Sequence, residues 1–210
     1  MSFQSSRNEL LGHTAVKNLN ARFFDACYCA TAQEAAQKAL SLIPQGSSVT
    51  WGGSASLAES GLLSMLKNGN YQILDRDAVP LEQKEAFYRQ AFYADFYLMS
   101  ANAISLTGEL VNIDGNGNRV AALAYGPKNV MILAGINKIT YTLQEAVARA
   151  RQEAAPINTQ RFPLSTPCRQ TGVCADCTCM DSICAQLLIT RLCRPKGRIK
   201  IILVGESLGF

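Results

Sequence analysis

Residues 49–57 read VTWGGSASL, an apolar strand that runs through two glycines into the start of a helix. Strand-like and helix-like segments alternate on both sides of this unit through the first half of the chain. Such alternation is typical of a parallel sheet with helices on both faces. The sequence therefore predicts an α/β protein with a Rossmann-like parallel core.

The expected elements can be placed by residue range. In the first half, strands are expected at 22–29, 48–51 and 71–74, and helices at 5–20, 32–43, 56–67 and 80–93. In the second half, strands are expected at 94–99, 103–106, 109–113, 119–124, 129–134 and 198–204, with a helix at 143–154. The steps DG and NG within residues 114–118 suit a tight turn. They predict an antiparallel hairpin of strands 109–113 and 119–124, added to the parallel core.

Composition limits the class of protein. The chain has 210 residues, of which 48% are hydrophobic and only 17% charged, enough for one well-formed core. We expect an α/β domain over residues 1–160 and, within the same domain, a cysteine-rich segment and final strand over 161–210. The net charge of +4 is spread along the chain without a basic stripe, so nucleic acid is not an expected partner.

The sequence also suggests a compartment. Residues 1–12 lack the apolar core of a signal peptide, and the longest apolar runs, such as 130–136, are too short to span a bilayer. A cytoplasmic protein without a membrane partner is the expectation. The single histidine, His13, falls on the first expected helix, where a solvated surface role is favoured, so hydrolase chemistry of the Ser-His-Asp type is close to excluded.

The glycine turn is the first candidate site. Gly52 and Gly53 allow close approach to a ligand, and Ser54 or Ser56 can cap the following helix, so the turn can offer main-chain N–H groups to a phosphate or carboxylate. An ordinary strand-to-helix turn with a serine cap is the plain alternative. The turn lacks the G-x-G-x-x-G pattern, so a dinucleotide is not indicated.

Polar residues after the glycine turn could complete this site. Arg119 could pair with an anionic ligand, and Glu59 or Glu109 could act as general acid or base. Glu59 could equally close a capping box with Ser56. The further candidate ligand-binding residues are Asn102, Asn112, Asp114 and Lys138. The run from Asp114 to Asn118 could simply be a hairpin turn, and its continuation does not fit a calcium loop.

Six of the eight cysteines fall between residues 168 and 193. In a reducing compartment such a cluster is more often a metal site than a set of disulfides. The C-x-x-C spacing of Cys174 and Cys177 is common to zinc and iron–sulfur centres. Outside this cluster, Cys27 and Cys29 alternate on an expected strand and are assigned to the core.

Three stretches resemble the lactate-utilisation (LUD) family. They are VTWGGSASLAESG at 49–61, SANAISLTGELVNIDGNGNRVAALAYGP at 100–127, and the pattern TPC-x5-C-x2-C-x6-C at 166–184. The resemblance implies a fold akin to the sugar-phosphate isomerase and CoA-transferase superfamily. It also implies a link to the oxidation of lactate to pyruvate, together with other iron–sulfur subunits. The four cysteines that match its pattern are Cys168, Cys174, Cys177 and Cys184, which leaves Cys179 and Cys193 as extras.

The favoured function is that of a redox-associated subunit or enzyme in the oxidation of a 2-hydroxy acid. It would bind a small carboxylate or phosphorylated ligand and a 4Fe–4S cluster, with zinc as the alternative metal. One competing hypothesis is a transferase or isomerase for CoA esters or sugar phosphates with a structural zinc site. Another is a non-catalytic assembly protein that senses metal or redox state. The oligomeric state is left open, with a homodimer as one option.

Overall fold

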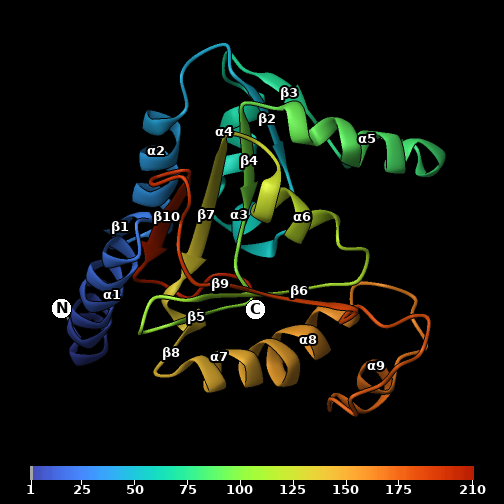
Figure 1. The fold of residues 1–210 in the computed structure, drawn as a ribbon. Helices are drawn as coiled ribbons and strands as arrows, with labels where there is room; N and C mark the ends of the chain where they lie inside the picture. The colour runs from blue at the N-terminus through green and yellow to red at the C-terminus, as the bar shows by residue number, and fades with distance from the viewer. Residues whose placement is uncertain (1) are drawn as a thin grey trace.

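The structure is a computed structural model that describes residues 2–210. Its centre is a six-stranded sheet in which every neighbouring pair is parallel (Figure 1). In spatial order the strands are β1 (Asp25–Cys29), β10 (Ile199–Val204), β7 (Asn129–Gly135), β4 (Phe96–Met99), β2 (Ser48–Trp51) and β3 (Gln72–Leu74). The predicted parallel α/β core is thereby confirmed.

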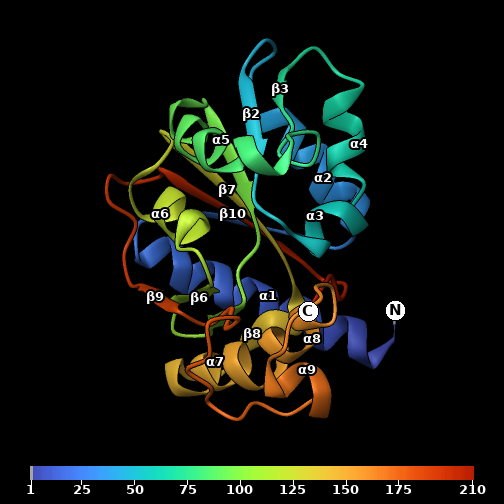
Figure 2. The same cartoon turned by 90° about the vertical axis from the view of Figure 1, so that its right-hand side faces the viewer.

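Helices cover both faces of this sheet (Figure 2). One face carries α2 (Ala32–Leu42), α3 (Ala55–Glu59) and α4 (Leu62–Lys67). The other face carries α1 (Phe3–Ala21), α6 (Asn118–Tyr125) and the segment of α5 (Lys84–Gln90), which lies between the 3₁₀ turns η1 (Leu81–Gln83) and η2 (Ala91–Tyr93). Both sheet faces are thus covered, as a parallel sheet requires.

A second, four-stranded sheet packs beside the first. Its spatial order is β8 (Ile139–Thr140), β5 (Ala103–Ser105), β6 (Leu110–Asp114) and β9 (Gln186–Thr190). Around it follow the 3₁₀ turn η3 (Ile136–Lys138), α7 (Leu143–Arg149), a π-helical turn (Ala150–Ala154), α8 (Ala155–Thr159) and α9 (Pro167–Thr171). The antiparallel part of the fold therefore belongs to a separate sheet, whereas the sequence suggested only a local addition to the core.

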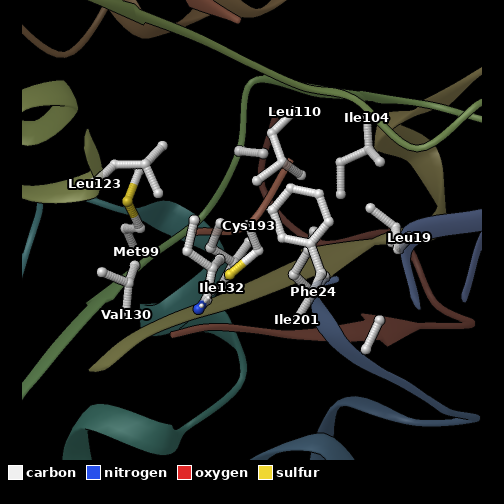
Figure 3. Close-up of a cluster of buried hydrophobic side chains, with 14 of the residues drawn as sticks. Leu19, Phe24, Met99, Ile104, Leu110, Leu123, Val130, Ile132, Cys193 and Ile201 are labelled. Carbon is white, nitrogen blue, oxygen red and sulfur yellow. Dashed lines mark hydrogen bonds between the residues drawn. The ribbon is translucent and has the colours of Figure 1, made fainter. Parts of the chain in front are cut away.

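The space between the two sheets is filled by the largest apolar core. Figure 3 shows Leu19 of α1 and Phe24 on one side of it, and Met99, Leu123 and Val130 on the other, with Ile104 and Leu110 from the second sheet above them. Cys193 lies in this core and is 2% exposed. Its thiol donates to the carbonyl of Pro195 and accepts from the amide of Ile199, at 3.2 Å in each case, so this extra cysteine has a structural role.

The predicted hairpin around residues 114–118 is wrong. Residues 119–124 are not a strand but part of α6, because Gly117 takes a left-handed conformation (φ +79°) and the Asp114 carboxylate accepts from the amides of Arg119 and Val120. A short apolar run fits a helix or a strand equally well, so its periodicity could not decide. The antiparallel partner of β6 comes from much later in the chain, at β9.

The helix predicted for residues 56–67 is also wrong as a single element. Gly61 has φ +75° and divides the segment into α3 and α4, of five and six residues. The glycine turn thus leads into a helix of only five residues, whose dipole is correspondingly small. Within residues 2–210, no helix has the length and apolar character needed to cross a membrane.

Candidate functional site

The candidate ligand-binding residues gather mainly at the carboxyl edge of the parallel sheet. Because β3, β2, β4 and β7 are consecutive parallel neighbours, the segments that follow them meet at this edge. Gly52 follows β2, Ser100 follows β4, and Lys138 lies in η3 after β7. Ligands of open α/β sheets usually bind at such an edge.

The glycine turn is closely enclosed. The Gly52 amide donates to the carbonyl of Leu98 at 2.9 Å, and the Ser54 hydroxyl caps α3 by accepting from the Leu57 amide at 3.3 Å. A Cβ added at Gly52 would lie 2.9 Å from the Tyr97 hydroxyl and 3.0 Å from Cδ of Arg119. Only glycine therefore leaves these side chains in place.

Three cations donate to three consecutive carbonyl groups after β4. Arg119 donates to Ser100 at 3.4 Å, Lys138 to Ala101 at 3.3 Å, and Arg149 to Asn102. Arg119 also donates to the carbonyl of Ile113 and to the side-chain oxygen of Asn102. Most partners of these cations are neutral oxygens, so the group carries excess positive charge.

The side-chain carboxylates near these cations are Glu153, Glu59 and Asp114, of which Asp114 accepts from the main-chain amide of Arg119. Glu153 pairs with Arg149 at 3.3 Å, but its side chain is 58% exposed. Glu59 acts on Lys138 only through its charge. Burial, followed by the charges of Arg149 and Arg119, lowers the pKa of Lys138 to about 7. Such a site favours an anionic ligand, because buried charge is costly when it is not compensated.

The segment 206–210 after β10 covers part of this edge. Ser56 donates to the carbonyl of Leu208 at 3.1 Å, and the Gly209 amide donates to Glu59 at 2.6 Å. Asn137 holds the same segment through hydrogen bonds with Leu208 and Gly209. Glu59 is therefore not the capping-box partner of Ser56, and both residues are engaged by main-chain groups.

Two other predicted residues, Asp114 and Glu109, make contacts that stabilise the fold. Asp114 caps α6, as described above. Glu109 lies at the β5–β6 turn, where its carboxylate accepts from Ser105 and Thr107 and pairs with Arg22 at 2.5 Å. Burial alone would raise the pKa of Glu109, but these hydrogen bonds and the Arg22 charge together hold it below its usual value. None of the other predicted site residues is among its hydrogen-bond partners.

Asn112 is fully buried in β6, and neither atom of its side-chain amide has a hydrogen-bond partner within the described chain. Asn102, by contrast, accepts from the Ile113 amide at 2.9 Å as well as from Arg119. Of the two predicted asparagines, only Asn102 thus contacts the cations of the carboxyl edge.

Sequence reasoning missed Arg76, Tyr97 and Arg149. Arg76 lies just after β3, and its Nη1 would be 3.2 Å from a Cβ added at Gly53. Tyr97 is 3% exposed within β4, and burial raises its pKa to about 12 against the opposing charges of Arg119 and Arg76. The position of Arg76 after a strand was a usable signal, whereas Tyr97 and Arg149 resembled ordinary strand and helix residues.

The four cysteines of the C-terminal pattern line one cavity of about 230 Å³, which is also bordered by apolar side chains. They are Cys168, Cys174, Cys177 and Cys184. Burial, followed by the charges of the other three cysteines, raises the pKa of the Cys184 thiol to about 11. The Cys168 sulfur lies 3.5 Å from the Thr166 hydroxyl and 3.7 Å from that of Thr159.

All eight cysteines are free thiols. Within residues 2–210, no three His, Cys, Asp or Glu side chains converge closely enough to hold a single metal ion. A larger groove of about 620 Å³ adjoins the cysteine cavity and shares Val147, Arg151 and Cys174 with it. Arg151 forms an ion pair with Asp176, which ties the cysteine-bearing loop to the π-helical turn.

A solved structure with a TM-score above 0.5 supports the fold assignment. A DUF162 family protein from Deinococcus radiodurans matches with a TM-score of 0.53 and 13% identity, over 94% of this chain and 98% of that one. Ribose 5-phosphate isomerase A from Methanocaldococcus jannaschii matches with a TM-score of 0.36 and 18% identity, over 54% and 56% of the two chains. eIF2B delta from Chaetomium thermophilum has a TM-score of 0.36 and 17% identity, over 66% and 54%.

No curated protein matches the sequence. The LUD domain family matches residues 13–204, which include both sheets and all four cysteines around the cavity. The chain therefore belongs to the LUD domain family, a family associated with lactate utilisation.

Proposed function

We propose that this protein takes part in the oxidation of lactate or a related 2-hydroxy acid, as a redox-associated component that binds a small anion and an iron–sulfur cluster. The anion would be a carboxylate or a phosphorylated ligand at the carboxyl edge of the parallel sheet. Other subunits of lactate oxidation are the expected partners, in keeping with the family.

The excess positive charge around residues 100–102 carries this proposal. Arg119, Lys138 and Arg149 donate to three successive main-chain carbonyls, and the Glu153 carboxylate that pairs with Arg149 is largely exposed. An anion would compensate this charge, since desolvated cations gain strongly from charge-assisted hydrogen bonds. Lys138 is buried beneath Phe210, so Arg119 is the better placed of these cations to contact a ligand directly.

The cysteine cavity supports the cluster. Its lining includes four thiols, and its volume is about 230 Å³. Cys168, Cys174, Cys177 and Cys184 would hold the group, and hydroxyls beside Cys168 would tune it by hydrogen bonding to sulfur. When bound, a 4Fe–4S cluster would supply one-electron transfer.

The first test is anaerobic purification of the full chain, followed by iron, sulfide and zinc analysis and by absorption spectroscopy. We expect about four iron atoms per chain and a broad band near 400 nm that bleaches with dithionite. Colourless protein with about one zinc per chain would overturn the cluster and favour the transferase or isomerase hypothesis.

The second test addresses the anion. Calorimetric titration of the same protein with L-lactate should show binding that Arg119→Gln weakens at least tenfold, because a charge-assisted contact is lost. Arg169→Gln is the matched control, since Arg169 lies on the exposed surface of α9. Equal affinities of wild type and Arg119→Gln would remove Arg119 from the site.

A further inference from the structure

Arg76 and Tyr97 face the glycine turn from the two strands that flank β2. Arg76 follows β3 and Tyr97 lies in β4, on either side of β2, which ends at Trp51 before the two glycines. Nη1 of Arg76 would be 3.2 Å from a Cβ at Gly53, and the Tyr97 hydroxyl 2.9 Å from a Cβ at Gly52. The two glycines are therefore bordered directly by a guanidinium and a phenol.

Neither polar group is fully used within the protein. The Tyr97 ring is buried, and no hydrogen bond contributes to the raised pKa of its hydroxyl. Nε of Arg76 has no hydrogen-bond partner among residues 2–210, and its contact with Asp77, at 3.4 Å, involves a side chain that is 68% exposed. Arg76 also lies over the ring of Tyr88 at 5.6 Å, and its Nη2 donates to the Tyr88 hydroxyl at 3.4 Å, which leaves Nη1 without a hydrogen bond to this neighbour.

This part of the edge differs from the part beneath segment 206–210. Ser56, Glu59 and Lys138 are bonded to that segment, whereas no hydrogen bond joins it to Arg76 or Tyr97. The aliphatic part of the Arg119 side chain packs next to Gly52, and its guanidinium donates to Ser100, Asn102 and Ile113. A guanidinium whose paired carboxylate is largely exposed, together with a phenol, forms a site complementary to a compact oxyanion.

We propose that Arg76, Tyr97 and the Gly52–Gly53 turn form an oxyanion subsite that binds the carboxylate or phosphate group of the ligand. Arg76 donates two N–H groups to the oxyanion, and the Tyr97 hydroxyl donates a third hydrogen bond. Arg119, whose side chain packs against Gly52, adds positive charge. The inference rests on the proposed anion-binding function and names the residues that recognise the anionic group.

Calorimetric titration of the full chain with inorganic phosphate and, separately, with L-lactate tests the subsite. We expect at least one probe to bind, and Arg76→Gln to weaken that probe tenfold or more. The better probe identifies the oxyanion as phosphate or carboxylate. Arg89→Gln serves as the control, because Arg89 is an exposed arginine on α5, paired only with exposed Glu85, and its loss should leave affinity unchanged.

Tyr97→Phe separates recognition from folding. It removes one hydroxyl and keeps the buried ring, so the unfolding midpoint should stay the same while probe affinity falls several-fold. Failure of both probes to bind wild type overturns the subsite, as does wild-type affinity in both Arg76→Gln and Tyr97→Phe.

The outcomes also distinguish the subsite from the proposed function. If Arg119→Gln weakens lactate binding but Arg76→Gln does not, the proposed function stands and the subsite is wrong. If Arg76 controls anion binding in a protein that lacks iron, the subsite stands and the redox role is wrong.

Discussion

Nζ of Lys138 lies 2.9 Å from the main-chain oxygen of Phe210, so the segment after β10 covers a buried amine at the carboxyl edge of the sheet. A second carbonyl, from Ala101, is 3.3 Å away. The amine is thus buried between two main-chain oxygens, and its burial makes the charged form costly in the folded state.

The costly charge of buried Lys138 predicts that the stability of the protein depends on pH. Burial and the neighbouring arginines lower the pKa of Lys138 to about 7 from 10.5, so above pH 7 the unfolded chain binds more protons and stability rises with pH. We expect the free energy of unfolding in urea to increase by about 1.5 kcal/mol between pH 7 and 8.5. Lys138→Met should remove this increase, and an equal increase in the variant would contradict the assignment.

Other buried groups with shifted pKa values titrate mainly above the range from pH 7 to 8.5. Burial raises the pKa of the Cys29 thiol to about 11 and that of the Tyr97 hydroxyl to about 12. These acids bind protons more tightly in the folded state, so they reduce stability only as the pH passes the ordinary values of 9.0 and 10.0 for the unfolded chain. Below pH 8.5 the Lys138 effect should therefore dominate.

Glu109→Gln should affect folding but not ligand binding. The variant loses the charge that pairs with Arg22 and weakens the hydrogen bonds from Ser105 and Thr107. We expect unfolding in urea to be easier by about 1–3 kcal/mol, with unchanged lactate affinity. Glu85→Gln, at an exposed ion pair with Arg89, should change stability by less than about 0.5 kcal/mol. A loss of lactate affinity in Glu109→Gln would return Glu109 to the candidate catalytic residues.

Cys177→Ser and Cys179→Ser form a matched pair only two residues apart. Cys177 lines the cysteine cavity, whereas Cys179 is exposed and outside it. We expect Cys177→Ser to lose most of its iron and the 400 nm band, and Cys179→Ser to retain both. Iron analysis of anaerobically purified variants measures the difference. Equal iron content in the two would place the cluster ligands elsewhere.

Asn112→Leu should stabilise the protein. The native amide is fully buried without a partner, so a leucine of similar size should raise the free energy of unfolding by about 1 kcal/mol. Asn102→Leu should instead lower it by about 1–3 kcal/mol, because the Ile113 amide and Arg119 lose an acceptor. Destabilisation by Asn112→Leu would mean that its amide has a partner such as a buried water.

The sequence by itself determined the parallel α/β core, the glycine turn after β2, the family and the set of four cysteines. These features depend on short-range information: apolar periodicity, glycines at a strand end, and fixed spacing between thiols. The position of Arg76 near the glycine turn could have been predicted in the same way, because Arg76 follows β3 and parallel strands end at one edge of the sheet.

Only the tertiary structure decided which of these residues meet. Pairing of β6 with β9, the helical state of residues 118–125 and the position of segment 206–210 over Ser56 and Lys138 all depend on contacts between distant parts of the chain. Arg119, Lys138 and Arg149 converge on residues 100–102 for the same reason. Local patterns carry no information about such contacts, because the packing of the whole core selects among segments that locally suit more than one structure.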